Sequence, residues 1–143
     1  MTDPSTKTVL VPIDGSANSR RALSYVAKRS RTGKRLHICI LNVQLPLPPS
    51  LFVTRAMIEQ HHDAKSKEDL KGTPAILTKY HVNAETLIRV GDPAQTIVQV
   101  ARQKHCGEIV MGTRGLGSLK GLILGSVTTK VIHLSKIPVT VVP

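Results

Sequence analysis

The feature that most constrains the fold is a regular alternation of short apolar segments with longer amphipathic ones. Residues 7–13 (KTVLVPI) are rich in β-branched side chains and predict a strand. Residues 19–30 then place Ala22, Leu23, Val26 and Ala27 at the spacing of one helix face. The two patterns recur, with strands expected at 36–43, 85–90, 108–111 and 138–142, and helices within 52–81, from Pro93, and at 126–135. Strands that alternate with helices need crossover connections, so we expect a parallel sheet with helices on both faces.

The length of 143 residues suits one doubly wound α/β domain that covers residues 1–143. Hydrophobic residues make up 41% of the chain and aromatic residues only 2%, so we expect an aliphatic core. Cys39 and Cys106 lack the spacing of a metal site, and Cys39 is predicted to be a small buried hydrophobe. The sequence Gly72-Thr73-Pro74 predicts that the helical segment 52–81 is split or kinked.

No segment has the pattern of a membrane span or of a targeting signal. The longest apolar runs fall far short of the roughly 20 residues that cross a bilayer. The first ten residues, MTDPSTKTVL, contain no basic stretch followed by an apolar region. We therefore expect a cytoplasmic protein with no membrane span.

A glycine-rich segment after the fourth predicted strand is the main candidate for a binding site. Five glycines fall between Gly112 and Gly125, within MGTRGLGSLKGLILGSVT. Glycine lets the backbone approach a ligand closely, and consecutive N–H groups form an anion-binding concavity. The helix predicted from Ser126 adds N–H donors and a positive dipole end, so the segment is predicted to hold phosphate. Arg114 and Lys120 are candidates to screen its charge, although neither the Walker pattern nor the dinucleotide fingerprint is present.

The position of this site in the fold depends on the order of the strands. Ligands of open α/β sheets bind beyond the carboxyl ends of the strands, where the strand order reverses. If the first and fourth strands are neighbours, Asp14 lies beside Gly112 at that reversal. The pattern of residues alone leaves this order open.

Four blocks of the sequence together resemble the universal stress protein family. Gly112, Gly115 and Gly125-Ser126 match the spacing of its ATP-binding signature, G-2x-G-9x-G-[S/T]. The segments VLVPIDGS, GDPAQTI and IPVTVV add to the resemblance, which covers nearly the whole chain. It implies a Rossmann-like sheet of the adenine nucleotide alpha hydrolase-like type, with five parallel strands in the order 3-2-1-4-5. It also implies an ATP-binding protein with a regulatory role in the stress response.

The resemblance further implies which residues hold the nucleotide. Asp14 would accept hydrogen bonds from the ribose hydroxyls, although a helix N-cap is the alternative role for this residue. Ile38 would correspond to a position that contacts adenine. ATP would carry Mg²⁺ (or Mn²⁺) on its phosphates. The full set of implied nucleotide-binding residues is Pro12, Ile13, Asp14, Ile38, Met111, Gly112, Thr113, Arg114, Gly115, Gly125, Ser126, Val127 and Thr128.

The resemblance implies two kinds of protein partner. Family members often dimerise through the final strand, and residues 138–142 would here form an edge strand whose unpaired backbone groups a second copy would satisfy. A regulated protein partner is also expected, and the sequence does not identify it. Two features depart from the family's usual pattern, namely the break at Gly72-Thr73-Pro74 and the high positive charge.

Two further functions stay open. The net charge of +11 is concentrated between Arg20 and Arg35, where seven cations occur without an acid. This segment is either the solvated face of a helix or a surface for nucleic acid or another polyanion. A slow ATPase or phosphotransferase is the other alternative, but we find no convincing catalytic residue, because His61, His62 and His133 are expected to be structural.

Overall fold

The computed structural model describes residues 6–33, 35–113 and 124–143. The predicted alternation of strands and helices is confirmed along this part of the chain. The elements, in chain order, are β1 (Lys7–Pro12), α1 (Ala17–Thr32), β2 (Leu36–Gln44), α2 (Arg55–Leu70), α3 (Thr73–Tyr80), β3 (Ala84–Val90), α4 (Pro93–Gln103), β4 (Glu108–Gly112), α5 (Ser126–Leu134) and β5 (Val139–Val142).

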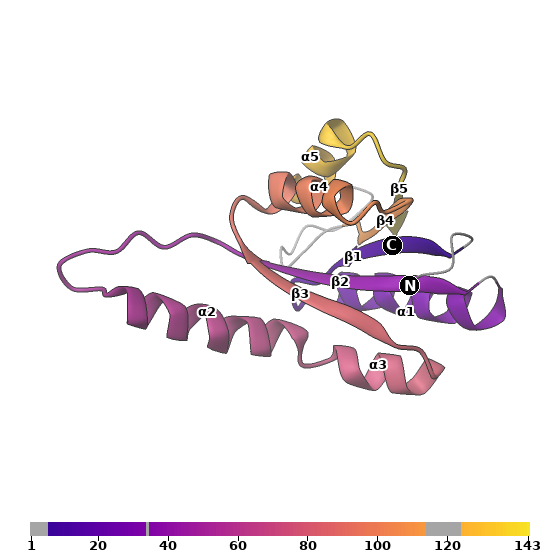
Figure 1. The fold of residues 1–143 in the computed structure, drawn as a ribbon, viewed down its shortest axis with the longest axis horizontal. Coiled ribbons are helices and arrows are strands. Elements are labelled where there is room, and N and C mark those ends of the chain that lie inside the picture. Colours follow the sequence, from indigo (N-terminus) through magenta and orange to yellow (C-terminus); the bar gives the residue numbers. More distant parts are fainter. Residues whose placement is uncertain (1–5, 34, 114–123) are drawn as a thin grey trace.

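The strands form one parallel sheet of order β3-β2-β1-β4-β5, as the resemblance implied. The chain winds outward from β1 to β3 and then returns to the centre, so β4 pairs with β1, with Val9 opposite Glu108. The topological switch point therefore lies between β1 and β4. Figure 1 shows α4 and α5 on one face of the sheet and α1, α2 and α3 on the other.

Two aliphatic clusters hold these layers to the sheet. One lies between the sheet and α4, and includes Leu10, Leu41 and Ile97. The other lies between the sheet and α1, and includes Val9, Ile40 and Leu23. Alternate residues of the central strands point into opposite clusters, which explains why β1 and β4 are apolar almost throughout.

Local sequence signals explain where the helices begin and end. Ser16 caps α1 by accepting a hydrogen bond from the Ser19 amide, and Asp92 caps α4 in the same way through Gln95. The break between α2 and α3 follows the sequence prediction, because Pro74 stands in the first turn of α3, where its missing N–H costs nothing. The second helical segment therefore consists of two pieces.

The segment 45–54 and α2 together form an arm that projects from the rest of the molecule (Figure 1). Leu51 and Phe52 in the segment before α2 are 98% and 87% exposed. The buried residues of α2 itself are Ser66 and Asp69, both polar. The arm is therefore joined to the sheet mainly through the carboxyl-terminal half of α2.

Both cysteines are buried and free, and the burial of Cys39 was predicted from the sequence. The pKa of the Cys39 thiol is raised to about 11, mainly by burial, and burial also raises the pKa of the Cys106 thiol. No helix among the described residues is both long and apolar enough to span a bilayer.

A buried carboxylate, Glu108, connects three elements at the amino-terminal end of the sheet. It accepts two hydrogen bonds from Arg29 of α1, at 3.2 and 2.8 Å, and one from Thr140 of β5 at 2.6 Å. Lys7 of β1 lies 3.2 Å from the same carboxylate. Burial alone would raise the pKa of Glu108, but the hydrogen bonds from Arg29, Thr140 and Lys7 outweigh it and lower the pKa to about 2.

Replacing this carboxylate with an amide tests its contribution to stability. We expect Glu108→Gln to lower the free energy of unfolding by about 3 kcal/mol at neutral pH, since it leaves Arg29 without its charged partner. The pKa of Glu108 lies below its ordinary value of 4.5, so the stabilisation is present above that pH and is lost as the pH falls toward 2. Denaturant unfolding across this pH range should show the wild type and the variant converging in acid.

Glu85→Gln is the matched control. Glu85 forms an ion pair with Lys104 and lies 3.5 Å from Nε2 of His37, but its side chain is 37% exposed. Solvent-screened pairs contribute little, so this change should cost much less than Glu108→Gln. Equal losses in the two variants would contradict the role assigned to Glu108.

Candidate functional site

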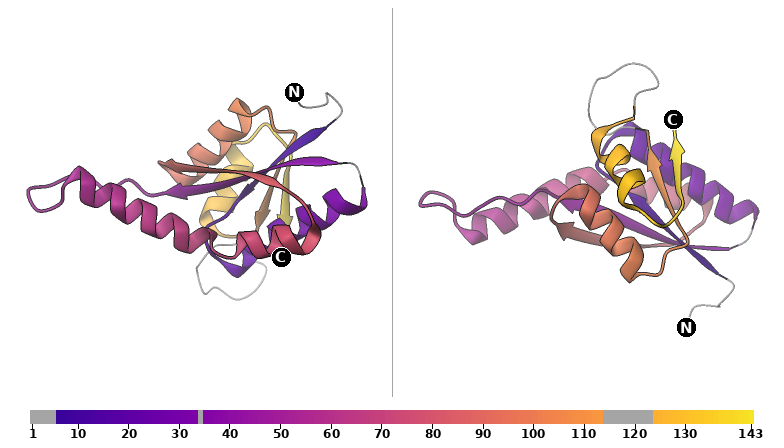
Figure 2. Two further views of the ribbon diagram at one scale, coloured as in Figure 1. Left: turned by 60° about the horizontal axis from the view of Figure 1, so that its bottom comes forward. Right: turned by 90° about the horizontal axis from the view of Figure 1, so that it is seen from above.

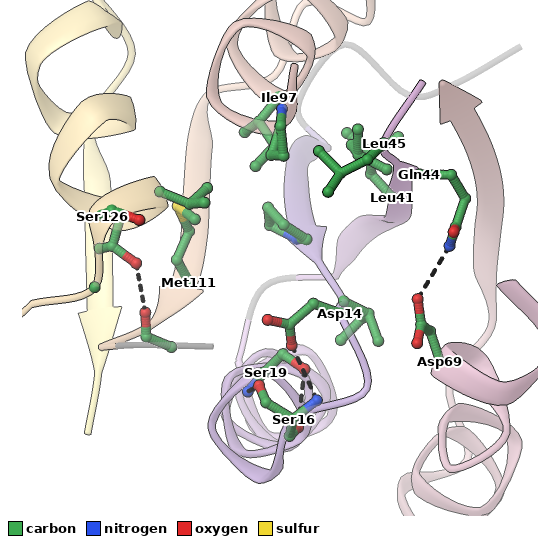
Figure 3. Close-up of a pocket in the computed structure, with 18 of the residues that line it drawn as sticks. Asp14, Ser16, Ser19, Leu41, Gln44, Leu45, Asp69, Ile97, Met111 and Ser126 are labelled. Carbon is green, nitrogen blue, oxygen red and sulfur yellow. Dashed lines mark hydrogen bonds between the residues drawn. The ribbon is translucent and has the colours of Figure 1, made fainter. Parts of the chain in front are cut away.

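The main pocket among the described residues lies at the carboxyl ends of the strands, where β1 and β4 separate. Its volume is about 660 Å³. The end of β1, the end of β4 and the start of α5 form one side, and the end of β2 and the arm form the other (Figure 3). The lining residues are Pro12, Ile13, Asp14, Ser16, Ser19, Leu41, Val43, Gln44, Leu45, Leu47, His61, His62, Lys65, Asp69, Pro93, Ile97, Met111, Gly112, Leu124, Gly125, Ser126, Val127 and Thr128.

Asp14 stands exposed in the turn that joins β1 to α1. Its Oδ1 accepts a hydrogen bond from the Ser16 amide at 2.9 Å, and Gly15 takes a left-handed conformation with φ of 86°. Ser16, rather than Asp14, caps α1. The N-cap alternative for Asp14 is therefore wrong, and its carboxylate borders the pocket (Figure 3).

The amino terminus of α5 faces the pocket without a side-chain cap. The first hydrogen bond of the helix runs from the Thr129 amide to the Gly125 carbonyl, so the amides of Ser126, Val127 and Thr128 precede the helical ladder. The first turn contains no acidic residue. These amides and the positive end of the helix dipole form the most favourable place for an anion among the described residues of the pocket.

The start of α5 is fixed to the end of β4 by two hydrogen bonds. The Gly125 amide donates to the Thr113 carbonyl at 2.7 Å, and the buried Thr128 hydroxyl donates to the Gly112 carbonyl at 3.0 Å. Thr113 in turn donates its amide to Val142 of β5 at 3.0 Å. The orientation of α5 toward the pocket thus follows directly from the sheet.

Gly112 is required by close packing against α1. A Cβ atom at this position would lie 2.7 Å from the backbone carbonyl carbon of Asn18. Real Cβ atoms do not approach backbone so closely, which means that any side chain would push β4 away from α1. This glycine of the signature therefore serves packing at the switch point.

A buried polar network joins the arm to the turn after β1. The Asn42 side-chain amide donates to the Ile13 carbonyl at 2.8 Å and to the Asp69 carboxylate at 3.1 Å. The Gln44 amide donates to Asn42 at 2.7 Å and to Asp69 at 3.0 Å, the latter bond drawn in Figure 3. Lys65 completes the network as an ion pair with Asp69 at 2.5 Å. Because Asp69 lies on α2, this network fixes the base of the arm beside the pocket.

Most of the residues that the resemblance implied come together here. Nine of them line the pocket, namely Pro12, Ile13, Asp14, Met111, Gly112, Gly125, Ser126, Val127 and Thr128. Thr113 lies directly behind the lining and holds Gly125 through its carbonyl. Arg114, Gly115 and Lys120 fall outside the described residues.

Ile38 is the exception, because it is buried in the core on the α1 side and is not part of the lining. It stands near the start of β2, whereas the pocket lies at the strand's carboxyl end, where Leu41, Val43 and Gln44 contribute instead. The expectation that Ile38 contacts adenine is therefore not met by its position.

Several lining residues were not anticipated from the sequence. His61 and His62 were expected to be structural, yet both line the pocket together with Lys65 and Asp69. The pattern of α2 gives no warning of this, because no run of apolar side chains marks the face that turns toward the sheet. Gln44 offered a signal, since a polar residue at the carboxyl end of a buried strand is typical of a site.

Fold and pocket together define a doubly wound α/β protein with a ligand crevice at its topological switch point. The chain matches the universal stress protein family over residues 5–143, and it belongs to this family. It is 33% identical over 144 residues to universal stress protein YxiE of Bacillus subtilis (strain 168), covering 94% of this chain and 97% of that protein.

Solved structures agree with this assignment. The protein MJ0577, whose structure was a test case for assigning biochemical function, shares 31% identity and a TM-score of 0.71, over 95% of this chain and 94% of that one. Three more distant structures hold nucleotides. They are a universal stress protein with cAMP, one from Archaeoglobus fulgidus with dAMP and one from Arabidopsis thaliana with AMP. These three structures are 22–24% identical to this chain, and their TM-scores of 0.67–0.68 show that they share its fold. Each match covers at least 95% of this chain and at least 90% of the other chain.

The packing role of Gly112 can be tested by adding one methyl group. We expect Gly112→Ala to lower the free energy of unfolding by about 2 kcal/mol, since the added Cβ meets the backbone of Asn18, which cannot move away. Gly107→Ala is the control, because the three atoms nearest to its Cβ all belong to the flexible Lys7 side chain, the first at 2.9 Å. Thermal unfolding of both variants measures the difference. A Gly112→Ala variant as stable as the wild type would rule out this explanation.

Proposed function

We propose that the chain binds ATP, with Mg²⁺ (or Mn²⁺) on its phosphates, as a regulatory stress-response homodimer in the cytoplasm. The observation that carries the proposal is the pairing, in one pocket, of the uncapped amino terminus of α5 with the exposed Asp14 carboxylate. The first suits phosphate and the second suits the hydroxyls of a ribose. A nucleotide carries both groups in one molecule, so it suits both parts of the pocket.

The phosphates belong at the start of α5. The amides of Ser126, Val127 and Thr128 are available there, and the Ser126 side chain is exposed. Hydrogen bonds from amides to a charged oxygen are stronger than those between neutral groups. Among the described residues no group of three or more His, Cys, Asp or Glu side chains could hold a metal ion. In the proposal the metal is therefore carried mainly by the phosphates.

The base belongs in the apolar part of the pocket, away from α5. Ile13 and Met111 come from the central strands, Leu41 and Val43 from β2, and Ile97 from α4. Planar apolar surface next to a few polar groups is the usual environment of a small-molecule ligand. The relatives whose structures hold AMP, dAMP and cAMP share adenine as their base, which supports adenine here too.

Binding is tested by calorimetric titration of nucleotide-stripped protein with ATP and Mg²⁺. Proline is tolerated in the first turn of a helix, so Ser126→Pro should keep α5 while removing one amide donor and one hydroxyl. We expect ATP to bind this variant roughly tenfold to hundredfold more weakly, the usual effect of losing a hydrogen bond to a charged group.

Ser126→Ala is the matched control, since it removes the hydroxyl but keeps the amide, and its loss should be smaller. AMP in place of ATP shows how much the outer phosphates contribute. A folded, stripped wild type that binds no adenine nucleotide would refute the proposal, and so would a Ser126→Pro variant with wild-type affinity.

The proposed homodimer uses the free edge of β5. The carbonyls of Pro138 and Val142 accept hydrogen bonds from Ile109 and Thr113, so the even-numbered residues of the strand pair with β4. By alternation, the backbone groups of Val139 and Val141 point toward the open edge. Unpaired edges readily accept a further strand, which a second copy would supply.

Val141→Pro should convert the dimer into a monomer. Proline removes the outward N–H of residue 141 and leaves the hydrogen bonds between β4 and β5 in place. Light scattering coupled to size exclusion measures the mass, and circular dichroism confirms that the fold is kept. A wild type that is monomeric at all concentrations would disprove the dimer without affecting the nucleotide site.

A further inference from the structure

The helical layer on the α1 side of the sheet has an uneven distribution of charge. No Asp or Glu occurs between Asp14 and Glu59, a run of 44 residues, and α3 also contains none. Over its 16 residues α1 carries five cations, Arg20, Arg21, Lys28, Arg29 and Arg31. On the opposite layer, α4 and α5 together carry only Arg102 and Lys130 besides His133. Because α2, in the same layer as α1, carries four acids against three cations, the positive charge is concentrated on α1.

The five cations of α1 fall into two groups. Arg29 is committed to Glu108 and stacks at 5.4 Å over the Tyr25 ring, and Arg20 donates to the Gly15 carbonyl at 2.7 Å. Arg21, Lys28 and Arg31 form no ion pair among the described residues, and all three are exposed. Arg21 donates one hydrogen bond among the described residues, from Nε to the Pro143 backbone oxygen at 3.1 Å.

These three side chains lie along one side of the helix, seven and three residues apart, and we call them the basic stripe. At a rise of about 1.5 Å per residue, the stripe extends roughly 15 Å along the helix axis. The apolar face of α1 is turned the other way and is fully buried against the sheet, with Ala22, Leu23, Val26 and Ala27 at 0% exposure. The stripe therefore presents charge on a rigid support, and none of its three residues lines the pocket. Figure 2 shows α1 from two further directions.

We propose that the basic stripe binds the phosphate backbone of double-stranded nucleic acid without regard to sequence. A duplex carries one negative charge per roughly 1.7 Å of its axis, so a row of uncompensated cations on a straight helix meets several phosphates at once. Such contacts need no base readout and no ordered loop.

Other polyanions fit the surface less well. Single strands are held by aromatic side chains that stack on bases, and Tyr25 is the one aromatic residue of α1. A helix that lies stably on a membrane inserts apolar side chains between the lipids, and the aliphatic side chains Ala22, Leu23, Val26 and Ala27 of α1 are buried. A protein interface normally has an apolar or aromatic centre, which the stripe does not offer.

The test measures anisotropy of a short labelled DNA duplex of mixed sequence, titrated with the full chain at several salt concentrations. Three phosphate contacts predict a slope of about −2.7 for log affinity against log salt, or a loss of roughly 40-fold between 50 and 200 mM. The triple variant Arg21→Glu/Lys28→Glu/Arg31→Glu should lose binding. The triple glutamine variant should weaken binding and flatten the slope while posing less risk to the fold.

The control reverses three exposed cations elsewhere, Arg102→Glu/Lys130→Glu/Lys136→Glu, which gives the same net charge as the first variant. It should keep most of the duplex binding, and an equal loss in both variants would overturn the proposal in favour of a net-charge effect. Tighter binding to a single strand, or binding only to vesicles of anionic lipid, would overturn it as well. Excess ATP should not displace the duplex; competition would mean that phosphates enter the pocket instead of binding the stripe.

Discussion

The contact between the end of β4 and the start of α1 is the constraint on which the site depends. At Gly112 the strand comes so close to Asn18 that no Cβ can be accommodated. That approach fixes the end of β4 against the first turn of α1, and both segments contribute residues to the pocket lining. It also places the Gly112 carbonyl where the Thr128 hydroxyl can donate to it, which sets the direction of α5. One glycine therefore affects both a wall of the pocket and the orientation of the uncapped helix terminus that faces it.

Two buried carboxylates connect the helices to the sheet at its opposite ends. Glu108 joins α1, β1 and β5 at the amino-terminal end, and Asp69 joins α2 to β2 beside the pocket. Each is almost fully enclosed, and each accepts several charged or amide donors, so their burial is compensated. The difference lies in what surrounds them. Glu108 lies on β4, whose next three residues belong to the two aliphatic clusters, whereas Asp69 is the main buried anchor of a helix with little apolar contact of its own.

The sequence was sufficient to predict the elements of the fold and nine of the residues that line the pocket. Pro74 correctly predicted the split helix, and the glycine and serine positions at the start of α5 correctly marked a pocket wall. The strand order came only through the family resemblance, because pairing between β1 and β4 leaves no local pattern. The place of His61, His62 and Asp69 in the pocket lining could not be predicted, because it depends on how α2 is oriented against the sheet. The expectation that Ile38 contacts the base was not met for a related reason. Leu41, only three residues further along β2, lines the pocket, whereas Ile38 lies in the core.

The burial of both thiols has a practical consequence for studying the arm. Thiolates, not thiols, react with alkylating probes, and Cys39 and Cys106 are enclosed with raised pKa values. These are the only cysteines in the chain. A cysteine introduced at the 87% exposed Phe52 position would react far faster than either of them. Fluorescent or spin labels can therefore be attached to the tip of the arm in the otherwise native sequence, and its distance to the sheet followed as ligands are added.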